Sequence, residues 1–254
     1  MKRTSRVKAK KSFKTYADNW KEDARLMQLA KCYDWMAERL ADIKPQRILD
    51  IGAESGLGIL ALKNSYNATV ISLEENPFCI HNSIQNLTAH KLTANPIFRL
   101  KLHDKPGLHY QIKPGQITLT DLTLIQADML TPDLELKQIL HKVEKFDAVA
   151  VWLIGTSGIK YGHAGLTTPL QYRTAIQQMA LEIARGCLRS GGVLHYIDRG
   201  STDEPGEHSE ESEEKNLTDF KQIKLETRIY EPGTTKISIS TSPEVNITDL
   251  HKFV

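Results

Sequence analysis

The sequence predicts an α/β fold built on a mostly parallel β-sheet, with an antiparallel hairpin at the C-terminal end. Three observations predict it. Short apolar runs alternate along the chain with stretches of helical periodicity, as in βαβ units. The run "KFDAVAVWLI" is apolar almost throughout, which is typical of a strand buried on both faces of a parallel sheet. Near the C-terminus, two β-rich runs flank Pro232 and Gly233, which indicates a hairpin.

The N-terminal region is predicted to be a basic arm followed by a helix. The arm covers residues 1–17, and its first 14 residues hold seven lysines and arginines and no acid. We expect such a segment to be solvated and flexible. From Asp18 onward, apolar residues recur three and four positions apart, which predicts a helix over 18–42. We treat 18–254 as a single domain, in keeping with its length.

The first strands and helices follow in regular order. Residues 47–51 form an apolar strand, 55–64 a helix, and "ATVISLE" a second strand that ends at Glu74. Pro77 suits the first turn of the next helix, which is expected to continue to about Ala89.

The second half of the sheet is expected after an insertion. Residues 89–121 are less regular and form this insertion, with a hairpin near 105–107. "LTLIQAD" (122–128) is then the third strand, and Pro132 opens a short helix. "KFDAVAVWLI" is the fourth strand, residues 172–188 a helix, and "VLHYID" the fifth strand.

Composition restricts the class of protein. Hydrophobic residues make up 40% and charged residues 25%, as in ordinary globular domains. No apolar run approaches the ~20 residues that cross a bilayer, and no secretory signal is present, so we expect a soluble, cytoplasmic protein. Cys32, Cys79 and Cys187 are odd in number and widely spaced. We therefore expect buried free thiols and no metal site.

Acids and glycines gather where the predicted strands end. Asp50 lies at the end of the first strand and is followed by Gly52 and Gly56, whereas Glu74 and Asp128 end the second and third strands. The carboxyl ends of parallel strands share one edge of the sheet, where ligands bind in open α/β folds. The sequence therefore predicts a ligand site at this edge.

The order of these segments resembles the class I S-adenosylmethionine-dependent methyltransferases. The motifs that carry the resemblance are "ILDIGAESG", "VISLEENP", "LIQADML", "FDAVAVWLI" and "CLRSGGVLHYID", followed by the hairpin, and they cover roughly residues 47–242. The resemblance implies a Rossmann-like, doubly wound sheet and S-adenosylmethionine as cofactor. It also implies transfer of a methyl group to an oxygen or nitrogen acceptor on a small molecule or a protein.

The resemblance also implies roles for the acids and glycines. Gly52 and Gly56 would let the backbone approach the methionine part of the cofactor, since no Cβ intervenes. Asp50 would hold the loop and, through it or water, the cofactor's ammonium group. Glu74 would accept hydrogen bonds from both ribose hydroxyls.

Two acids are candidates for the position that faces the adenine of the cofactor. Asp128 would accept from the adenine amino group, with Met129 and Phe78 on either side of the ring. "PIFRLKLHD" (96–104) could instead be the third strand, with Asp104 as its terminal acid. We prefer Asp128 because the following "MLTPDL" and the distance to "FDAV" fit better.

Glu54 departs from the family pattern, which usually has a third glycine there. A side chain at this position would crowd the cofactor or require a positive φ, at a cost of about 1 kcal/mol. Alternatively, its carboxylate would bind the ammonium group or offset the sulfonium charge. "GLGILA" (56–61) matches a dinucleotide-binding pattern, but its first glycine follows the strand too late for NAD.

Acceptor chemistry would lie in the loop after the fourth strand. Trp152 could stack on a planar acceptor, His163 could take a proton from a hydroxyl, and Tyr161 is a third candidate. The alternative is a structural tryptophan beside a solvated histidine. The Asn or Asp followed by Pro-Pro-Tyr or Phe that grips an exocyclic base amine is missing, which disfavours methylation of adenine or cytosine amines.

The distribution of charge leaves the substrate class open. The basic arm would attract RNA, whereas the acidic loop at 201–214 follows the fifth strand and would repel a polyanion from the ligand edge. Two alternatives to the small-molecule or protein methyltransferase therefore stand: an RNA-binding methyltransferase, or a non-catalytic scaffold of the same fold, for which Glu54 is the main indication.

Overall fold

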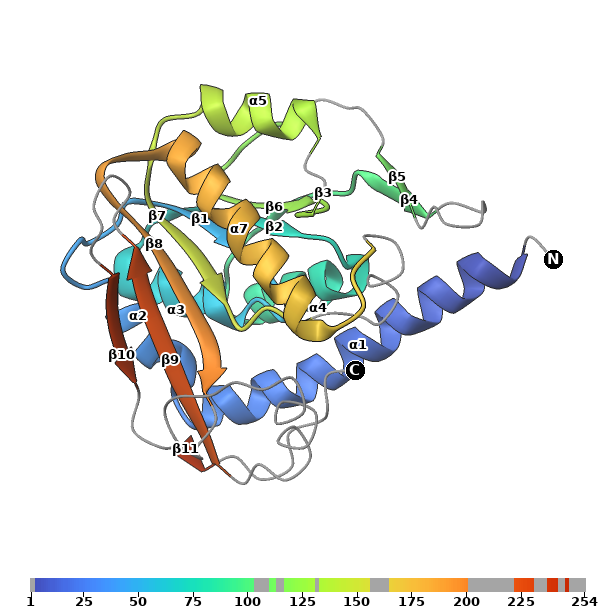
Figure 1. Ribbon diagram of the computed structural model, residues 1–254, viewed down its shortest axis with the longest axis horizontal. Coiled ribbons are helices and arrows are strands. Elements are labelled where there is room, and N and C mark those ends of the chain that lie inside the picture. The colour runs from blue at the N-terminus through green and yellow to red at the C-terminus, as the bar shows by residue number, and fades with distance from the viewer. Residues whose placement is uncertain are drawn as a thin grey trace.

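The centre of the molecule is a twisted β-sheet with the strand order β10-β9-β8-β7-β1-β2-β6-β3 (Figure 1). The computed structural model describes residues 3–102, 110–112, 117–130, 133–155, 165–200, 222–230, 237–241 and 245–246. The strands are β1 (Arg47–Ile51), β2 (Thr69–Glu74), β3 (Asn95–Ile97), β6 (Leu122–Gln126), β7 (Phe146–Trp152), β8 (Leu188–Gly200), β9 (Gln222–Tyr230) and β10 (Ile237–Thr241), with β11 (Val245–Asn246) beside β9.

Strand directions divide the sheet into two parts. From β3 to β8, neighbouring strands pair in parallel. In contrast, β9 pairs antiparallel with β8, and β10 pairs antiparallel with β9. Residues 231–236, between β9 and β10, lie outside the described residues. The predicted α/β class, with a Rossmann-like doubly wound sheet, is confirmed.

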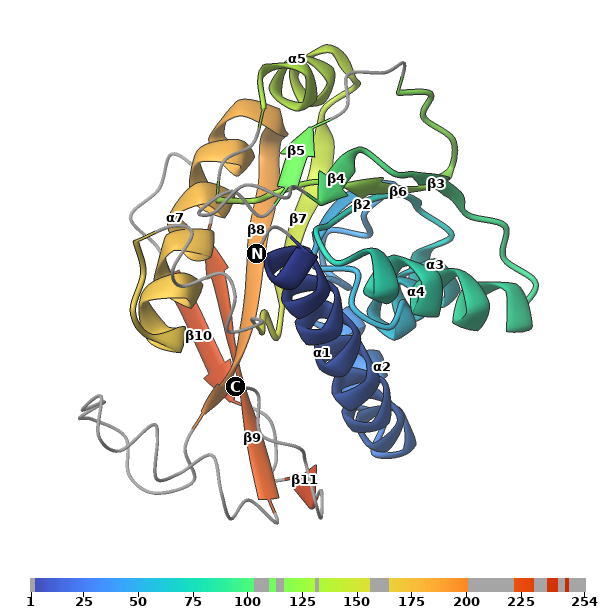
Figure 2. The ribbon, with the colours of Figure 1, turned by 90° about the vertical axis from the view of Figure 1, so that its right-hand side faces the viewer.

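Helices cover both faces of the sheet (Figure 2). The helices are α1 (Arg3–Leu29), α2 (Cys32–Glu38), α3 (Leu57–Tyr66) and α4 (Pro77–Ala89) on one face, and α5 (Leu134–Lys142) and α7 (Pro169–Cys187) on the other. Successive strand residues point to opposite faces, so Ile48 joins the first core cluster and Leu49 the second. Two covered faces explain why the central strands are apolar without alternation.

Side-chain caps set the starts of three helices close to the predicted positions. The Asn76 side chain accepts from the Phe78 N–H at 3.0 Å, and Pro77 occupies the first turn of α4. Asp133 caps α5, and Thr168 caps α7. Each cap satisfies an N–H group that has no partner inside its helix, which is why α7 begins before the predicted residue 172.

The prediction for the N-terminus is wrong in two respects. Residues 10–17 belong to α1 and are not a free arm, because Phe13 and Ala17 are buried. They begin an apolar stripe that continues through Trp20 and that the surrounding lysines obscure in the sequence. The predicted helix 18–42 is also divided, since Lys31 adopts a left-handed conformation (φ 58°) between α1 and α2.

The predicted insertion 89–121 contributes an edge strand and a small separate sheet. β3 extends the main sheet beside β6, whereas β4 (Leu100–Leu102) pairs antiparallel with β5 (Tyr110–Ile112). The predicted turn at 105–107 and the acidic loop 201–214 lie outside the described residues. All three cysteines are buried and free, as predicted. Among the described helices, none combines the length and apolar character needed to cross a membrane.

Candidate functional site

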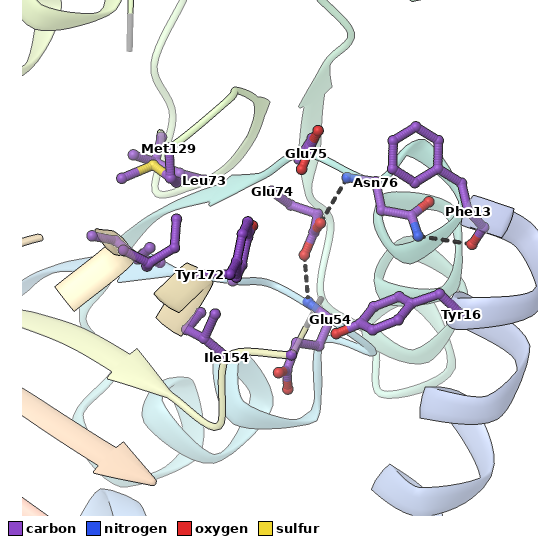
Figure 3. A pocket seen from close by; sticks show the side chains of 14 residues that line it. Phe13, Tyr16, Glu54, Leu73, Glu74, Glu75, Asn76, Met129, Ile154 and Tyr172 are labelled. Atoms are coloured by element: carbon purple, nitrogen blue, oxygen red, sulfur yellow. Dashed lines mark hydrogen bonds between the residues drawn. The ribbon is translucent and has the colours of Figure 1, made fainter. Parts of the chain in front are cut away.

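The carboxyl ends of β1, β2 and β7 meet around a cavity of about 60 Å³ (Figure 3). The chain passes from β1 to β2 on one side and later returns to β7 on the other side of β1. Strand order therefore reverses here, which is where open α/β sheets bind their ligands. The cavity lies at the predicted edge of the sheet.

Glu74 joins the two loops that form the rim of this cavity. It ends β2, and its Oε2 accepts from the Glu54 N–H at 3.0 Å while its Oε1 accepts from the Asn76 N–H at 2.7 Å (Figure 3). Burial raises the pKa of Glu74 to about 7, although the N–H groups of Asn76 and Glu54 oppose the rise. Among the described residues, no lysine or arginine forms an ion pair with Glu74.

Both predicted glycines are required, but for different contacts. Gly52 has φ +96°, lines the cavity, and a Cβ there would lie 2.6 Å from Ile154 Cδ1. Gly56 has φ +79° and begins α3, where a Cβ would lie 2.9 Å from the Ser83 backbone. Gly52 therefore belongs to the site, whereas Gly56 packs α3 against α4 and is not among the residues that line the cavity.

Glu54 has a positive φ, which is one of the two consequences expected for a side chain at a position where the family usually has glycine. Its φ is 49°, and its side chain lines the cavity together with Glu74 and Glu75. The strain of about 1 kcal/mol that this conformation costs is offset in part by the hydrogen bond from its N–H to Glu74. Glu54 is therefore a fixed member of the rim.

Asp50 and Asp128 are buried beside the cavity but do not line it, so the expected set of three converging strand-end acids is wrong. β1 continues to Ile51, so the Asp50 side chain points to one face of the sheet and accepts from Ser72 Oγ at 2.6 Å. Burial raises the pKa of Asp50 to about 7. Asp128 Oδ1 accepts from the Leu130 N–H at 3.0 Å.

The choice between the two candidates for the third acid is settled by the sheet. β6 pairs in parallel with β2, so it is the third strand, and Asp128 is the acid that follows it. Asp104 lies outside the described residues. Met129 is among the residues that line the cavity, whereas Phe78 is not.

Sequence reasoning missed the aromatic wall of the cavity. Phe13 and Tyr16 reach it from α1, and Tyr172 reaches it from α7 (Figure 3). A Cβ added to Gly155 would clash with the Tyr16 hydroxyl oxygen, so this hydroxyl lies against the loop after β7. Burial, and then the charge of Glu54, raise the pKa of Tyr16 well above its ordinary value. The apolar stripe that begins at Phe13 is the feature of the sequence that could have predicted this wall.

The prediction that Trp152 stacks on an acceptor is wrong. Trp152 is 3% exposed, and its Nε1 donates to Nδ1 of the buried His195 at 3.1 Å. Its position in β7 directs the ring into the core beneath the helices rather than toward the cavity. Burial lowers the pKa of His195 to about 3, so this histidine stays neutral. Tyr161 and His163 lie outside the described residues.

The chemistry of the cavity fits S-adenosylmethionine better than its volume does. Glu54, Glu74 and Glu75 line it, and no lysine, arginine or histidine is among its described lining residues, which suits a positively charged ligand. The volume of about 60 Å³ is well below the roughly 300 Å³ of small-molecule sites. Phe13 and Tyr16 are among the residues that line it.

Comparison with known proteins finds similar folds among methyltransferases. The SAH-bound methyltransferase PaMTH1 of Podospora anserina is 18% identical over 73% of this chain and 61% of its own, with a TM-score of 0.40. A candidate O-methyltransferase from Nostoc punctiforme is 14% identical over 72% of this chain and 40% of its own, with a TM-score of 0.46. An S-adenosylmethionine-dependent methyltransferase from Clostridium acetobutylicum is 9% identical over 84% of this chain and 72% of its own, with a TM-score of 0.39.

The chain thus spans less than two thirds of the Podospora and Nostoc proteins. No protein-family model matches the sequence, and no curated protein matches it. At these identities and TM-scores, we infer function from the chain's own residues.

Proposed function

We propose that the chain binds S-adenosylmethionine at the carboxyl edge of its sheet and transfers the methyl group to an oxygen or nitrogen acceptor. One observation carries the proposal: Glu74 ends β2 beside the positive-φ loop of Gly52 and Glu54, where the strand order reverses. This arrangement places carboxylates and close backbone together at the edge where α/β sheets bind ligands.

Glu74 is the residue proposed to hold the ribose. Each of its carboxylate oxygens accepts one backbone N–H, which leaves further lone pairs for hydroxyl donors. The same two N–H groups fix the orientation of the carboxylate, so little conformational entropy is lost when a ligand binds.

Gly52 and the acids of the rim are proposed to receive the methionine part. Gly52 allows close backbone approach, because it carries no Cβ. Glu54 and Glu75 balance the positive charge of the ligand. S-adenosylmethionine, when bound, supplies a sulfonium methyl group, and the chain's contribution is to orient it and to exclude water.

Calorimetric titration with S-adenosylmethionine and its demethylated product tests the proposal. We expect Glu74→Ala to weaken binding at least about tenfold, since a hydrogen bond to a charged group contributes about 1.5–3 kcal/mol. Glu144→Ala is the matched control, because Glu144 is 83% exposed and lies at the opposite end of the sheet. Equal affinities of the two variants would contradict the role of Glu74.

The non-catalytic scaffold is the second candidate, and the small volume of the cavity favours it. Phe13 and Tyr16 line the cavity beside Glu74, and Trp152 is buried in the core. Titration separates the two candidates. A protein that binds neither S-adenosylmethionine nor its product, even after Phe13 and Tyr16 are truncated, is the scaffold.

A further inference from the structure

The N-terminal half of α1 is strongly basic. Residues 3–14 of this helix contain six lysines and arginines and no acid, and the first acid along the chain is Asp18. We call residues 3–14 the basic segment. The first turns of α1 reach beyond the sheet and the neighbouring helices (Figure 1). Positive charge is thus concentrated on a part of the molecule that a partner can approach.

The described lysines of the basic segment lie on the outer side of α1. Lys10, Lys11 and Lys14 are exposed, whereas Phe13 is 3% exposed and packs on the opposite side. Lys14 forms an ion pair with Asp18. Within the described part of the chain, no acid forms an ion pair with Lys10 or Lys11. These two charges are therefore available to an anionic partner.

The charges of the basic segment oppose the stability of the helix that carries them. The N-terminal end of a helix has a partial positive charge, so acids stabilise it, yet α1 begins at Arg3 and has no acid in its first turn. Lys10 and Lys14 are four positions apart, where like charges repel. Residues that break such local rules are expected where function requires them. An anionic partner would remove these repulsions.

The apolar side of α1 separates two classes of anionic partner, a membrane surface and a nucleic acid. A helix that lies on a membrane buries its apolar side among the lipids. In α1, Phe13, Ala17 and Trp20 are at most 3% exposed and are buried in the protein, so they are not available to lipid. Contacts with phosphate groups need only the basic side of a helix. The structure therefore favours a nucleic acid.

The same packing favours a single strand over a duplex. A helix reads a duplex by entering its major groove, whereas Phe13 and Ala17 hold α1 against the rest of the protein. The basic segment is roughly 18 Å long at 1.5 Å per residue, over which a flexible strand can place several phosphates. We propose that the basic segment binds the phosphate backbone of a single-stranded nucleic acid. This inference does not depend on cofactor binding.

Full-length Lys10→Gln/Lys11→Gln tests the inference. The measurement is fluorescence anisotropy of a labelled single-stranded RNA of uridines, titrated at a series of salt concentrations. We expect the variant to bind at least about tenfold more weakly than the wild type at low salt. The slope of log affinity against log salt should become shallower by about 1.4, since each phosphate contact with a single strand contributes about 0.7. Single-stranded DNA of the same length should behave alike, because the contacts are to phosphate.

Lys137→Gln/Lys142→Gln is the matched control. Both lysines are exposed on α5, which covers the other face of the sheet, so this variant loses the same charge elsewhere. We expect its affinity and salt slope to equal those of the wild type. Urea denaturation should show that Lys10→Gln/Lys11→Gln is at least as stable as the wild type, because neutralisation removes repulsion within α1. Weaker binding then reports on the surface and not on unfolding.

Four outcomes would overturn the inference. Equal weakening in the two double variants would show that overall charge, and not the basic segment, attracts RNA. Tighter binding to duplex DNA than to the single strand would exclude the single-strand surface. Binding to phosphatidylserine vesicles without binding to RNA would assign the segment to membranes. Wild-type affinity in Lys10→Gln/Lys11→Gln would remove the segment's role, whereas failure to bind S-adenosylmethionine would overturn only the proposed function.

Discussion

The buried carboxylates at the two ends of the parallel sheet have different kinds of partner. At the amino end, Asp147 near the start of β7 accepts from Arg189 Nε and from the N–H groups of Gln46 and Arg47. At the carboxyl end, within the described part of the chain, Glu74 is hydrogen-bonded without a cationic side chain to pair with it. The difference lies in whether the chain supplies the positive charge itself.

Opposite pKa shifts follow from this difference. Burial alone would raise the pKa of Asp147, but hydrogen bonds from Arg189 and the backbone lower it overall. Burial raises the pKa of Asp50 and of Glu74 to about 7 each. The charged form of the amino-end acid is thus stabilised by groups of the chain itself. At the carboxyl end, a bound cation would stabilise the charged forms of the acids.

Removing the amino-end acid has the largest expected effect. Asp147→Ala should lower the free energy of unfolding by about 3 kcal/mol, because two backbone N–H groups lose their acceptor. Urea denaturation measures the change. Glu144→Ala removes only the exposed partner of Arg47 and should cost less than about 0.5 kcal/mol. Similar losses in the two variants would show that the Asp147 contacts are not structural.

The pH dependence of stability should separate the two ends. A raised pKa in the folded state means that the contribution of Asp50 and Glu74 is complete below their ordinary pKa values and is lost as pH rises through about 7. The free energy of unfolding should therefore fall by on the order of 2 kcal/mol from pH 5 to pH 8. Asp147, with its lowered pKa, should lose its contribution only as pH falls through the acid range below about 4. Denaturation at a series of pH values would contradict this if stability were flat from 5 to 8.

A substitution at the carboxyl end should have the smaller and opposite effect. Asp50→Asn keeps an oxygen that can accept from Ser72 Oγ and removes a buried charge. We expect the free energy of unfolding at pH 8 to rise by about 1 kcal/mol and the slope between pH 5 and 8 to decrease. Thermal denaturation in matched buffers measures both. A loss of stability at pH 8 would mean that the charged form of Asp50 is the one that the fold favours.

Local patterns predicted the strands and the start of α4 well. Apolar runs placed β1, β2, β6 and β7, and Pro77 marked the first turn of α4. The positive φ of Glu54 was one of two alternatives considered for this position, and it follows from a tight turn between strand and helix. These features depend on residues close together in the chain.

Side-chain direction at the site was predicted less well. Asp50 lies within β1, which continues to Ile51, and Trp152 is the last residue of β7, yet neither side chain is among those that line the cavity. A shift of one residue in a strand reverses the face that its side chains occupy. The sequence alone did not specify where each strand stops.

By itself, the sequence determined the α/β order, the parallel core and the glycine-acid loop, because periodicity and turn chemistry act over a few residues. Only the tertiary structure decided that α1 crosses the sheet edge and that Phe13 and Tyr16 line the cavity beside Glu74. The lysine-rich composition of residues 1–14 indicated solvent exposure, but helical spacing buries Phe13 while Lys10, Lys11 and Lys14 remain on the surface. Contacts between segments sixty residues apart depend on how the helices pack, which no local pattern encodes.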